Sequence, residues 1–408
     1  MRVVTERIPH LHSVSMGIWL NVGSRDEEES ESGLTHFTEH MLFKGTENRS
    51  ALAIAKQLDA VGGMSNAFTS KENTCFHAKV LDAHLPLVVE ILADIFLNSV
   101  FDQREVERER EVILQEISMV EDTPDEYVHV LLNQTFWDGN SLARPILGTA
   151  RTVQSFTREM SLEFLRRAYH PDRIVLSAAG NLDHQQFLDL VEPAFSGIER
   201  HSHSLKRTPP TISSQVGLYP RDLEQVHLCL GTRGTSVEEE ERYCCSILNV
   251  ILGGSMSSRL FQEVRERRGL AYSIYSFLSS HTDAGMLGIC GAVRAENIME
   301  TLELVRKELQ RLKHEAITGT ELRDAKEHIK GGIYLAAENS DNRMSRLAKN
   351  EMNFGRFVPY GEIEAGLERV TPDDVQALAN RICQPELMSL VLLGQVDGLD
   401  VDRTFLDF

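Results

Sequence analysis

The sequence lacks the features that would place it in a membrane, on nucleic acid or on an export route. No window approaches the about 18 uncharged apolar residues of a membrane-spanning helix, and the first residues, MRVVTERIPHLHS, contain no apolar signal-peptide core. Basic residues are outnumbered by acidic ones, 42 against 61, which gives a net charge of −19. Because nucleic-acid binding needs a basic surface, we expect no nucleic-acid partner, and because long apolar runs are lacking, we expect no membrane partner. The acidity is compatible with cation binding, with basic peptides or with solubility alone.

Cysteines are few and show no pairing pattern. They form no C-x-x-C pair and lie mostly in apolar runs such as CFHAKV and HLCLG, where reduced cysteine behaves as a small core residue. Because free thiols persist in reducing compartments, we expect reduced cysteines and a cytoplasmic protein. The six cysteines are Cys75, Cys229, Cys244, Cys245, Cys290 and Cys383.

What is present is the composition of a soluble globular chain with more than one domain. The 408 residues are 42% hydrophobic and 25% charged, and this length exceeds what one hydrophobic core usually supports. A polar stretch containing Pro209-Pro210, ERHSHSLKRTPPTISSQV, lies near the midpoint and is typical of a linker. We therefore expect an N-terminal domain over residues 1–200, a linker over 201–215 and a C-terminal domain over 216–408.

The two halves of the sequence repeat each other weakly. A strand-like run over residues 13–22 (SVSMGIWLNV) has a counterpart over 225–230 (QVHLCL), and an acidic cluster follows each. Later in each half a helix, a turn and a strand end at Gly180 and Gly394. Strands and helices do not alternate strictly, so the pattern favours an α+β fold of two homologous domains, each a mainly antiparallel sheet with packed helices. The clearest amphipathic helices are predicted over residues 85–97 and 298–312.

An H-x-x-E-H motif, formed by His36, Glu39 and His40, lies in a proline-free segment of helical periodicity, LTHFTEHMLFKGT. Residues four apart lie on one face of a helix, so both imidazoles can reach one metal ion. Glu39 lies beside them and is placed to take a proton from a metal-bound water, whose pKa the cation lowers. The alternative is a pair of histidines on a surface helix, one of them capped by a glutamate.

Two imidazoles leave a zinc site incomplete, so a further ligand is expected elsewhere in the chain. The acidic segment 105–126, EVEREREVILQEISMVEDTPDE, predicts a helix that ends before its Thr-Pro pair. Its apolar residues indicate one buried side, and some glutamates must lie at the boundary of that side. The pattern does not choose between Glu109 and Glu116, and a solvated charged face is the alternative.

Together these stretches resemble the pitrilysin/insulysin family of zinc metallopeptidases with the inverted H-x-x-E-H motif. The nearest resemblance is to the β-subunit of the mitochondrial processing peptidase and its bacterial relatives. The matching residues are GLTHFTEHMLFKGT and the downstream EREVILQEI. The resemblance implies one Zn²⁺ per chain on His36, His40 and Glu116, with Co²⁺ or Mn²⁺ as substitutes, and Glu109 orienting the ligands. Thr38 departs from the leucine that relatives usually carry, but it is not a ligand position.

The resemblance also implies a second domain that contacts substrate without carrying the chemistry. The stretch aligned with the motif there, residues 248–252, is apolar and contains no histidine or glutamate. The segment SSRLFQEVRERRGLAYSIYSF resembles the family segment whose arginine and tyrosine contact the scissile peptide, which implies this role for Arg265 and Tyr272. Such groups stabilise the oxyanion of a tetrahedral intermediate. The alternative is an arginine paired with a neighbouring glutamate and a tyrosine in the core.

A glycine-led, β-rich segment over residues 62–80, GGMSNAFTSKENTCFHAKV, predicts a strand that could lie at a sheet edge. In relatives the corresponding stretch binds the substrate as an added strand through backbone hydrogen bonds. A plain hairpin strand is the alternative. The residues that match the family stretch are Asn66, Ala67, Phe68 and Thr69.

The residues and the resemblance together predict a zinc metalloendopeptidase that cleaves extended peptides or presequence-like segments, with Glu39 as general base. Family members assemble four such domains into a clamshell, so this chain would supply half of one. A homodimer is expected, and a heterodimer with an inactive sister is the alternative. The short Gly253-Gly254 turn, unlike the long glycine-rich loop of the non-catalytic processing subunit, favours a self-sufficient chain. The rival functions are a non-catalytic structural or substrate-presenting subunit and a metal-storage or metal-sensing protein.

Overall fold

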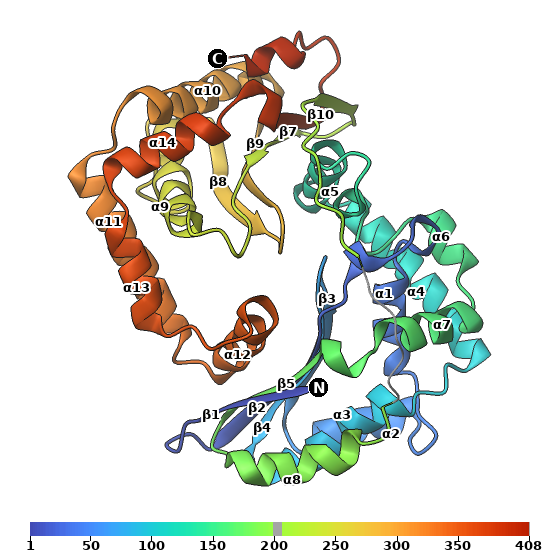
Figure 1. Cartoon of the computed structure of the whole chain (residues 1–408). Helices are drawn as coiled ribbons and strands as arrows, with labels where there is room; N and C mark the ends of the chain where they lie inside the picture. The colour runs from blue at the N-terminus through green and yellow to red at the C-terminus, as the bar shows by residue number, and fades with distance from the viewer. Residues whose placement is uncertain (199–205, 408) are drawn as a thin grey trace. The chain divides into compact units, whose positions relative to one another are not determined.

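The computed structural model describes residues 1–198 and 206–407, which form two compact units (Figure 1). Each unit combines segments from both halves of the sequence. The predicted linker lies in part, at residues 201–205, outside the described residues, so the linear division into domains stays a prediction. Unit 1 comprises Met1–Met119, Arg144–Arg207 and Leu335–Phe357, and unit 2 comprises Val120–Ala143, Thr208–Tyr334 and Val358–Phe408.

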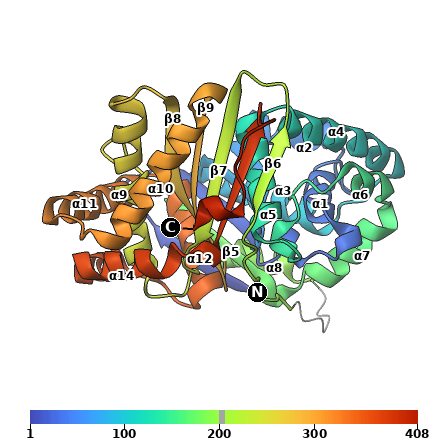
Figure 2. The ribbon, with the colours of Figure 1, turned by 90° about the horizontal axis from the view of Figure 1, so that it is seen from above.

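In the described part of the chain each unit contains a five-stranded sheet, and the two sheets have equivalent strand orders, β1-β5-β2-β4-β3 and β6-β10-β7-β9-β8. The pairs β1–β5 and β6–β10 are parallel and the other pairs are antiparallel. In Figure 2 the strands of unit 2 follow one another from β8 to β6, with the red β10 between β7 and β6. The α+β prediction of two similar, mainly antiparallel domains is confirmed. The strands of unit 1 are β1 (Arg2–Arg7), β2 (Ser13–Leu20), β3 (Met64–Thr69), β4 (Thr74–Leu81) and β5 (Ile174–Gly180). Those of unit 2 are β6 (Val216–Pro220), β7 (Gln225–Arg233), β8 (Ala271–Ser280), β9 (Gly285–Arg294) and β10 (Met388–Gly394).

Helices cover one face of each sheet and enclose the main core of that unit. In unit 1 the strand residues Val14, Met16 and Ile18 point into this core, as the alternation along β2 requires. Figure 1 shows α3 and α8 along this sheet. The helices of unit 1 on the chain before residue 199 are α1 (Leu34–Leu42), α2 (Ala51–Ala60), α3 (Leu85–Leu97), α4 (Gln103–Glu121), α6 (Ala150–Ser155), α7 (Arg158–Ala168) and α8 (His184–Phe195). Those of unit 2 after residue 205 are α9 (Arg242–Leu252), α10 (Ile298–His314), α11 (Gly319–Ala336), α13 (Tyr360–Arg369) and α14 (Pro372–Ile382).

The opposite face of each sheet is covered by a helix from the other half of the sequence. In unit 1 this helix is α12 (Ser340–Phe354), which packs on β1, β2 and β5. The Trp19 indole N–H donates to Met344 Sδ at 3.2 Å, and the hydroxyls of Ser15 and Ser340 lie 2.8 Å apart. Trp19 and Met344 are fully buried, so this contact forms a second, smaller core of unit 1.

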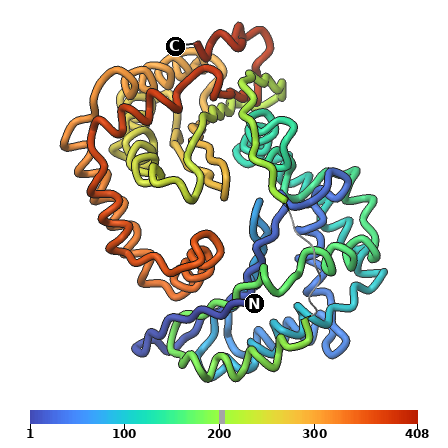
Figure 3. The backbone as a smooth tube through the Cα atoms, in the orientation of Figure 1, coloured from blue at the N-terminus to red at the C-terminus, as the bar shows by residue number. Residues whose placement is uncertain are grey.

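In unit 2 the equivalent position is taken by α5 (Pro124–Phe136), which packs on β7 and β10. Leu132 and Phe136 of this helix form an apolar cluster with Cys229, Met286 and Val391. Figure 3 shows the exchange by colour, with the orange-red α12 segment beside the blue and green strands of unit 1.

Gly180 and Gly394, which end the two repeated strands, are both required by the backbone conformation at these positions. Gly180 closes β5 with φ 142° and Gly394 closes β10 with φ 139°, a backbone conformation that L side chains rarely adopt. A Cβ at Gly180 would lie 2.2 Å from the Ser13 carbonyl oxygen, and one at Gly394 would lie 2.6 Å from that of Gln225. The weak sequence repeat therefore marks the same backbone turn in both sheets.

The prediction of six reduced cysteines is wrong for one pair. Cys229 and Cys290 are joined as a disulfide, while the other four cysteines are free and buried. The two cysteines lie opposite each other on β7 and β9. They are 61 residues apart in the sequence, so their pairing could not be predicted from their spacing. Among the described residues, no helix is both long enough and apolar enough to cross a membrane.

Candidate metal centre

The H-x-x-E-H motif lies on α1, whose first turn is held by the buried carboxylate of Glu27. The backbone N–H groups of Gly33 and Thr35 donate to this carboxylate at 2.9 and 2.7 Å. The Glu27 oxygens accept from N–H groups that have no partner within the helix, and these hydrogen bonds act against the burial that raises the pKa of Glu27 to about 8. The apolar residues of α1 are fully buried and fix the helix in the core of unit 1. They are Leu34, Phe37, Met41 and Leu42.

Two imidazoles and one carboxylate converge in unit 1. Glu116 Oε2 on α4 lies 3.8 Å from His36 Nε2 and 3.9 Å from His40 Nε2, and the three atoms all lie within 4.8 Å of one another. In a tetrahedral zinc site with bonds of about 2.0–2.1 Å, such atoms lie about 3.4 Å apart. The two distances to Glu116 exceed this value by about half an ångström, and two nitrogens with one oxygen is a donor set that suits zinc.

Glu109 contacts His40 on the ring nitrogen that faces away from Glu116. Its Oε1 lies 2.7 Å from His40 Nδ1, and its Oε2 receives Lys44 Nζ at 2.6 Å. If Nδ1–H donates to Glu109, the Nε2 lone pair is left facing Glu116. The sequence pattern left the choice between two glutamates open, and their geometry separates them: Glu116 faces both Nε2 atoms, whereas Glu109 holds the far nitrogen of one ring.

The protonation of the two histidines follows from their surroundings. Burial lowers the pKa of His36 to about 3, together with repulsion from His40, which keeps its imidazole in the neutral form that binds metal. Burial also acts to lower the pKa of His40, but the hydrogen bond to Glu109 and the charges of Glu39 and Glu116 outweigh it and raise the pKa. The site therefore combines one neutral imidazole with one held by a carboxylate.

The Glu39 carboxylate is held by a residue of the sheet. Its Oε2 accepts a hydrogen bond from the Thr69 hydroxyl, at 2.5 Å, at the end of β3. Burial raises the pKa of Glu39, although the hydrogen bond from Thr69 and the charge of His40 act against this. A carboxylate whose pKa moves up toward neutrality is a better proton acceptor for catalysis near pH 7.

A hollow of about 400 Å³ opens beside these residues. Its polar wall includes Glu39, His40 and Glu109, and residues 65–67 of β3 form part of its rim. The remaining lining is mostly apolar and comes from Phe43 and α2, namely Ala51, Ile54, Ala55 and Leu58. The catalytic candidates thus adjoin a space that can take an apolar side chain.

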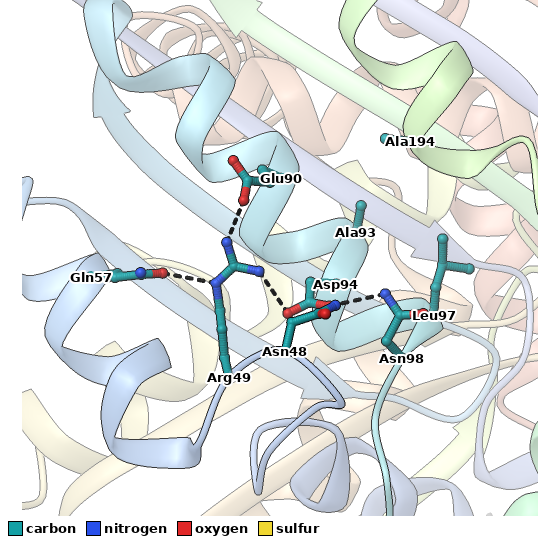
Figure 4. Close-up of a pocket in the computed structure, with 9 residues that line it drawn as sticks. All are labelled: Asn48, Arg49, Gln57, Glu90, Ala93, Asp94, Leu97, Asn98 and Ala194. Carbon is teal, nitrogen blue, oxygen red and sulfur yellow. Dashed lines mark hydrogen bonds and ion pairs between the residues drawn. The ribbon is translucent and has the colours of Figure 1, made fainter.

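A second hollow of unit 1 is crossed by a polar network around Arg49 and Asp94 (Figure 4). The Arg49 guanidinium donates to Asp94, Glu90 and Gln57. Asn98 and residues of the turn after α1 also bind the Asp94 carboxylate. The network fixes the turn that follows α1, so we interpret this hollow as structural.

The residues predicted to bind the substrate lie on a strand beside the candidate ligands. Asn66, Ala67, Phe68 and Thr69 lie on β3, which is the edge strand of its sheet as predicted for a substrate-binding strand. Their role in binding a substrate stays a prediction.

Arg265 and Tyr272 belong to unit 2, so their role toward the histidines also stays a prediction. The Arg265 guanidinium carbon lies 4.9 Å from the centre of the Tyr272 ring. Its Nε lies 3.6 Å from Glu266 Oε1. Tyr272 is 82% exposed and therefore not a core residue.

Sequence reasoning missed two residues that support the site, and it missed the contact of a third, Thr69, which it predicted only as part of the substrate-binding strand. Lys44, the Thr69 hydroxyl and Glu27 hold Glu109, Glu39 and the start of α1 respectively. Lys44 lies four residues after His40, which was a usable signal. The other two residues become neighbours of α1 only through folding.

Comparison with known proteins assigns the family of the chain. A model described as insulinase (peptidase family M16) matches residues 2–150, and one described as peptidase M16 inactive domain matches residues 155–329. A protein of Bacillus subtilis named uncharacterized zinc protease YmxG is 42% identical over 382 residues, covering 94% of this chain and 93% of that protein. One of Streptomyces coelicolor named uncharacterized zinc protease SCO5738 is 40% identical over 390 residues, covering 94% and 85%. The chain belongs to the M16 (pitrilysin) family of peptidases, as the resemblance predicted, while its closeness to the mitochondrial β-subunit stays a prediction.

Solved structures share the fold at low sequence identity. A protease from Helicobacter pylori aligns with a TM-score of 0.90 and 21% identity, covering 96% of both chains. A chain of complex III2 from Candida albicans aligns with a TM-score of 0.86 and 20% identity, covering 99% of this chain and 96% of that one. The same architecture thus occurs in a protease and in a chain of complex III2, so the function has to be argued from the site.

Proposed function

We propose that the chain is a zinc-dependent endopeptidase whose hydrolytic centre lies on α1 and α4. The observation that carries this proposal is the convergence of His36, His40 and Glu116 beside a buried glutamate, Glu39, of raised pKa. Relatives with the name zinc protease support the choice of metal and of reaction.

Each side chain has a defined part in the proposed reaction. Zinc held by the three ligands would lower the pKa of a bound water and polarise the scissile carbonyl. Glu39 accepts the proton of the attacking water and later gives it to the leaving amine. The Thr69 hydroxyl keeps the Glu39 carboxylate in place, and Glu109 does the same for the His40 ring.

The substrate is proposed to be an extended peptide that binds along β3. Among the described strands, β4 is the neighbour of β3, and the other edge of β3 ends the sheet. An extended peptide can add to such an edge through backbone hydrogen bonds, which tolerates varied sequences. The apolar wall from Phe43, Ile54 and Leu58 would receive one of its side chains.

A second chain completes the proposed enzyme. The family resemblance implies four α+β domains in a closed assembly, and one chain has two such units. We propose a homodimer in which Arg265 and Tyr272 stabilise the developing oxyanion. Light-scattering mass measurement of the purified protein tests the dimer, and a monomeric mass during active turnover would contradict it.

Replacement of the proposed base tests the mechanism. Glu39→Gln is expected to leave zinc content unchanged, because Glu39 is not a ligand, and to reduce peptide cleavage by about 10²–10⁴-fold, the usual contribution of a general base. Zinc is measured by mass spectrometry, and cleavage is measured with a pool of fluorogenic peptides.

The matched control is Glu111→Gln, an exposed glutamate on α4, which should leave cleavage unchanged. Wild-type cleavage rates in Glu39→Gln would contradict the assigned mechanism. Zinc binding without any cleavage by the wild-type chain would favour the non-catalytic or metal-storage alternatives.

A further inference from the structure

A second cluster of metal-binding side chains lies in unit 2, outside the hydrolytic centre. His129 on α5 faces Cys229 on β7 and Cys290 on β9. Its Nδ1 lies 4.0 Å from Cys229 Sγ and 3.9 Å from Cys290 Sγ. A tetrahedral zinc with bonds of about 2.0–2.1 Å to nitrogen and about 2.3 Å to sulfur separates such atoms by about 3.6 Å. The separation of Nδ1 from each sulfur is therefore close to the separation of two ligand atoms of one zinc ion.

The two cysteines are presented as a pair by the sheet itself. They are directly opposite each other in the antiparallel register of β7 and β9, with Cα atoms 4.3 Å apart. In this structure the sulfurs are bonded as a disulfide. Reduction by a thiol or phosphine adds two electrons and two protons, and it leaves two thiols facing the same ring.

The second nitrogen of the imidazole is also held. His129 Nε2 lies 2.9 Å from the Tyr275 hydroxyl. When Nε2–H donates to that oxygen, the Nδ1 lone pair is directed at the sulfurs, which is how bound histidines are usually oriented by a second partner. Burial lowers the pKa of His129, although the charge of Asp125 acts in the opposite direction, and this favours the neutral ring that binds metal.

The surroundings of the sulfurs make free thiolates costly. Cys229 and Cys290 are buried in the apolar cluster with Leu132, Phe136 and Met286. Two adjacent thiolates in such surroundings would repel each other and lack solvation, so they need a cation to balance their charge. Sulfur ligands favour thiophilic ions such as zinc over calcium or magnesium.

We propose that the reduced chain binds a second zinc ion through Cys229, Cys290 and His129, at a site separate from the hydrolytic centre. Both thiols release their protons to solvent on binding, and water completes the tetrahedron. The ion ties α5 to β7 and β9 and so stabilises the helix that this unit receives from the other half of the sequence. The disulfide and the metal are mutually exclusive states of the pair.

Cobalt substitution tests the site, because thiolate ligands give Co²⁺ a sulfur-to-metal charge-transfer absorption in the near ultraviolet and the nitrogen and oxygen ligands of the hydrolytic centre do not. The full chain is reduced with a phosphine, freed of metal and titrated with Co²⁺. We expect a charge-transfer band that saturates at one ion per chain and a total of two bound ions. Glu116→Gln should keep the band, which separates this result from any failure of the proposed peptidase function.

Variants assign the ligands. Cys229→Ser combined with Cys290→Ser should abolish the band and leave one bound ion, while Cys244→Ser, a buried cysteine of the same unit outside the cluster, should keep both ions. Tyr275→Phe keeps the ring but loses the hydroxyl, and it should weaken cobalt binding at this site by about tenfold. The proposal is overturned if the reduced wild-type chain shows no band, if the pair stays oxidised under the reductant, or if the band survives the double replacement.

Discussion

At the scale of single residues, Glu109 shows how one side chain sets the working orientation of another. It is almost fully buried and divides its two oxygens between His40 and Lys44. A buried carboxylate is stable only where such partners balance its charge, and here the partners are a metal-ligand candidate and a lysine. The position therefore contributes to metal affinity without being a ligand.

Removal of this charge gives the first residue-scale prediction. Glu109→Gln should lower zinc affinity by about 10–100-fold, because the His40 ring loses its charged acceptor and becomes a weaker ligand. Zinc affinity is measured by competition with a chromogenic chelator. Glu111→Gln on the same helix is the control, and equal affinities in the two variants would contradict the orienting role of Glu109.

Sequence reasoning proposed the candidate ligands and, through the resemblance, the orienting role of Glu109, but not the contact between Glu39 and Thr69. The four-residue spacing of His36 and His40 is a local property of any helix, so it could be predicted. The link between Glu39 and Thr69 joins residues thirty positions apart, and no periodicity reports such a distance. The assignment of Glu116 over Glu109 came from the family resemblance, and the spacing alone left it open.

At the scale of elements, the network around Asp94 holds the turn after α1 against α3. Asp94 is 5% exposed and accepts hydrogen bonds from Thr46, Asn48, Arg49 and Asn98. Burial alone would raise the pKa of Asp94, but these hydrogen bonds outweigh it and lower the pKa to about 2. The carboxylate is therefore charged in the folded state and stabilises it through its partners.

Asp94→Asn should destabilise the protein by about 3 kcal/mol, because the Arg49 guanidinium loses its buried partner. Urea unfolding followed by circular dichroism measures the loss. Glu90→Gln, which removes the exposed partner of the same arginine, should cost less than about 1 kcal/mol. A similar decrease in the free energy of unfolding in both variants would contradict a larger contribution of the buried network.

The same carboxylate predicts a pH dependence. The pKa of Asp94 falls from 3.8 to about 2 on folding, so its contribution of about 2 kcal/mol is fully present above pH 4. It is lost as the pH falls through 2, because the folded state then takes up the proton that the unfolded state already holds. The stability difference between wild type and Asp94→Asn should therefore shrink from pH 4 to pH 2, and a constant difference would contradict the assignment.

The positions of helices in the sequence were easier to predict than the sheets on which they pack. The amphipathic pattern placed a helix at residues 85–97, and α3 spans Leu85–Leu97. Periodicity shows which face of a helix is buried, but it does not show which sheet receives that face. For this reason α5 and α12, each amphipathic, gave no sign in the sequence that they pack in the unit of the other half. The strand pairing of Cys229 with Cys290 was hidden for the same reason.

At the scale of the whole molecule, the exchange of α5 and α12 makes each unit depend on both halves of the sequence. Without α12, the face of the first sheet that carries Trp19 would be exposed, and without α5 the second sheet would expose the face around Met286. Large exposed apolar faces favour association and aggregation. Neither half of the chain therefore has a complete unit of its own.

Division of the chain between residues 198 and 206 tests this dependence. Expressed alone, residues 1–198 lack α12 and carry α5 without its sheet, so we expect aggregation and loss of zinc binding, although His36, His40 and Glu116 are all present. Expressed together, the two halves should co-purify and bind zinc. As a control, a protease site placed at residues 199–205 and cut after folding should leave the halves associated until urea separates them. A soluble, zinc-binding, cooperatively unfolding fragment of residues 1–198 would show that the exchanged helices are dispensable and that each half folds as a domain of its own.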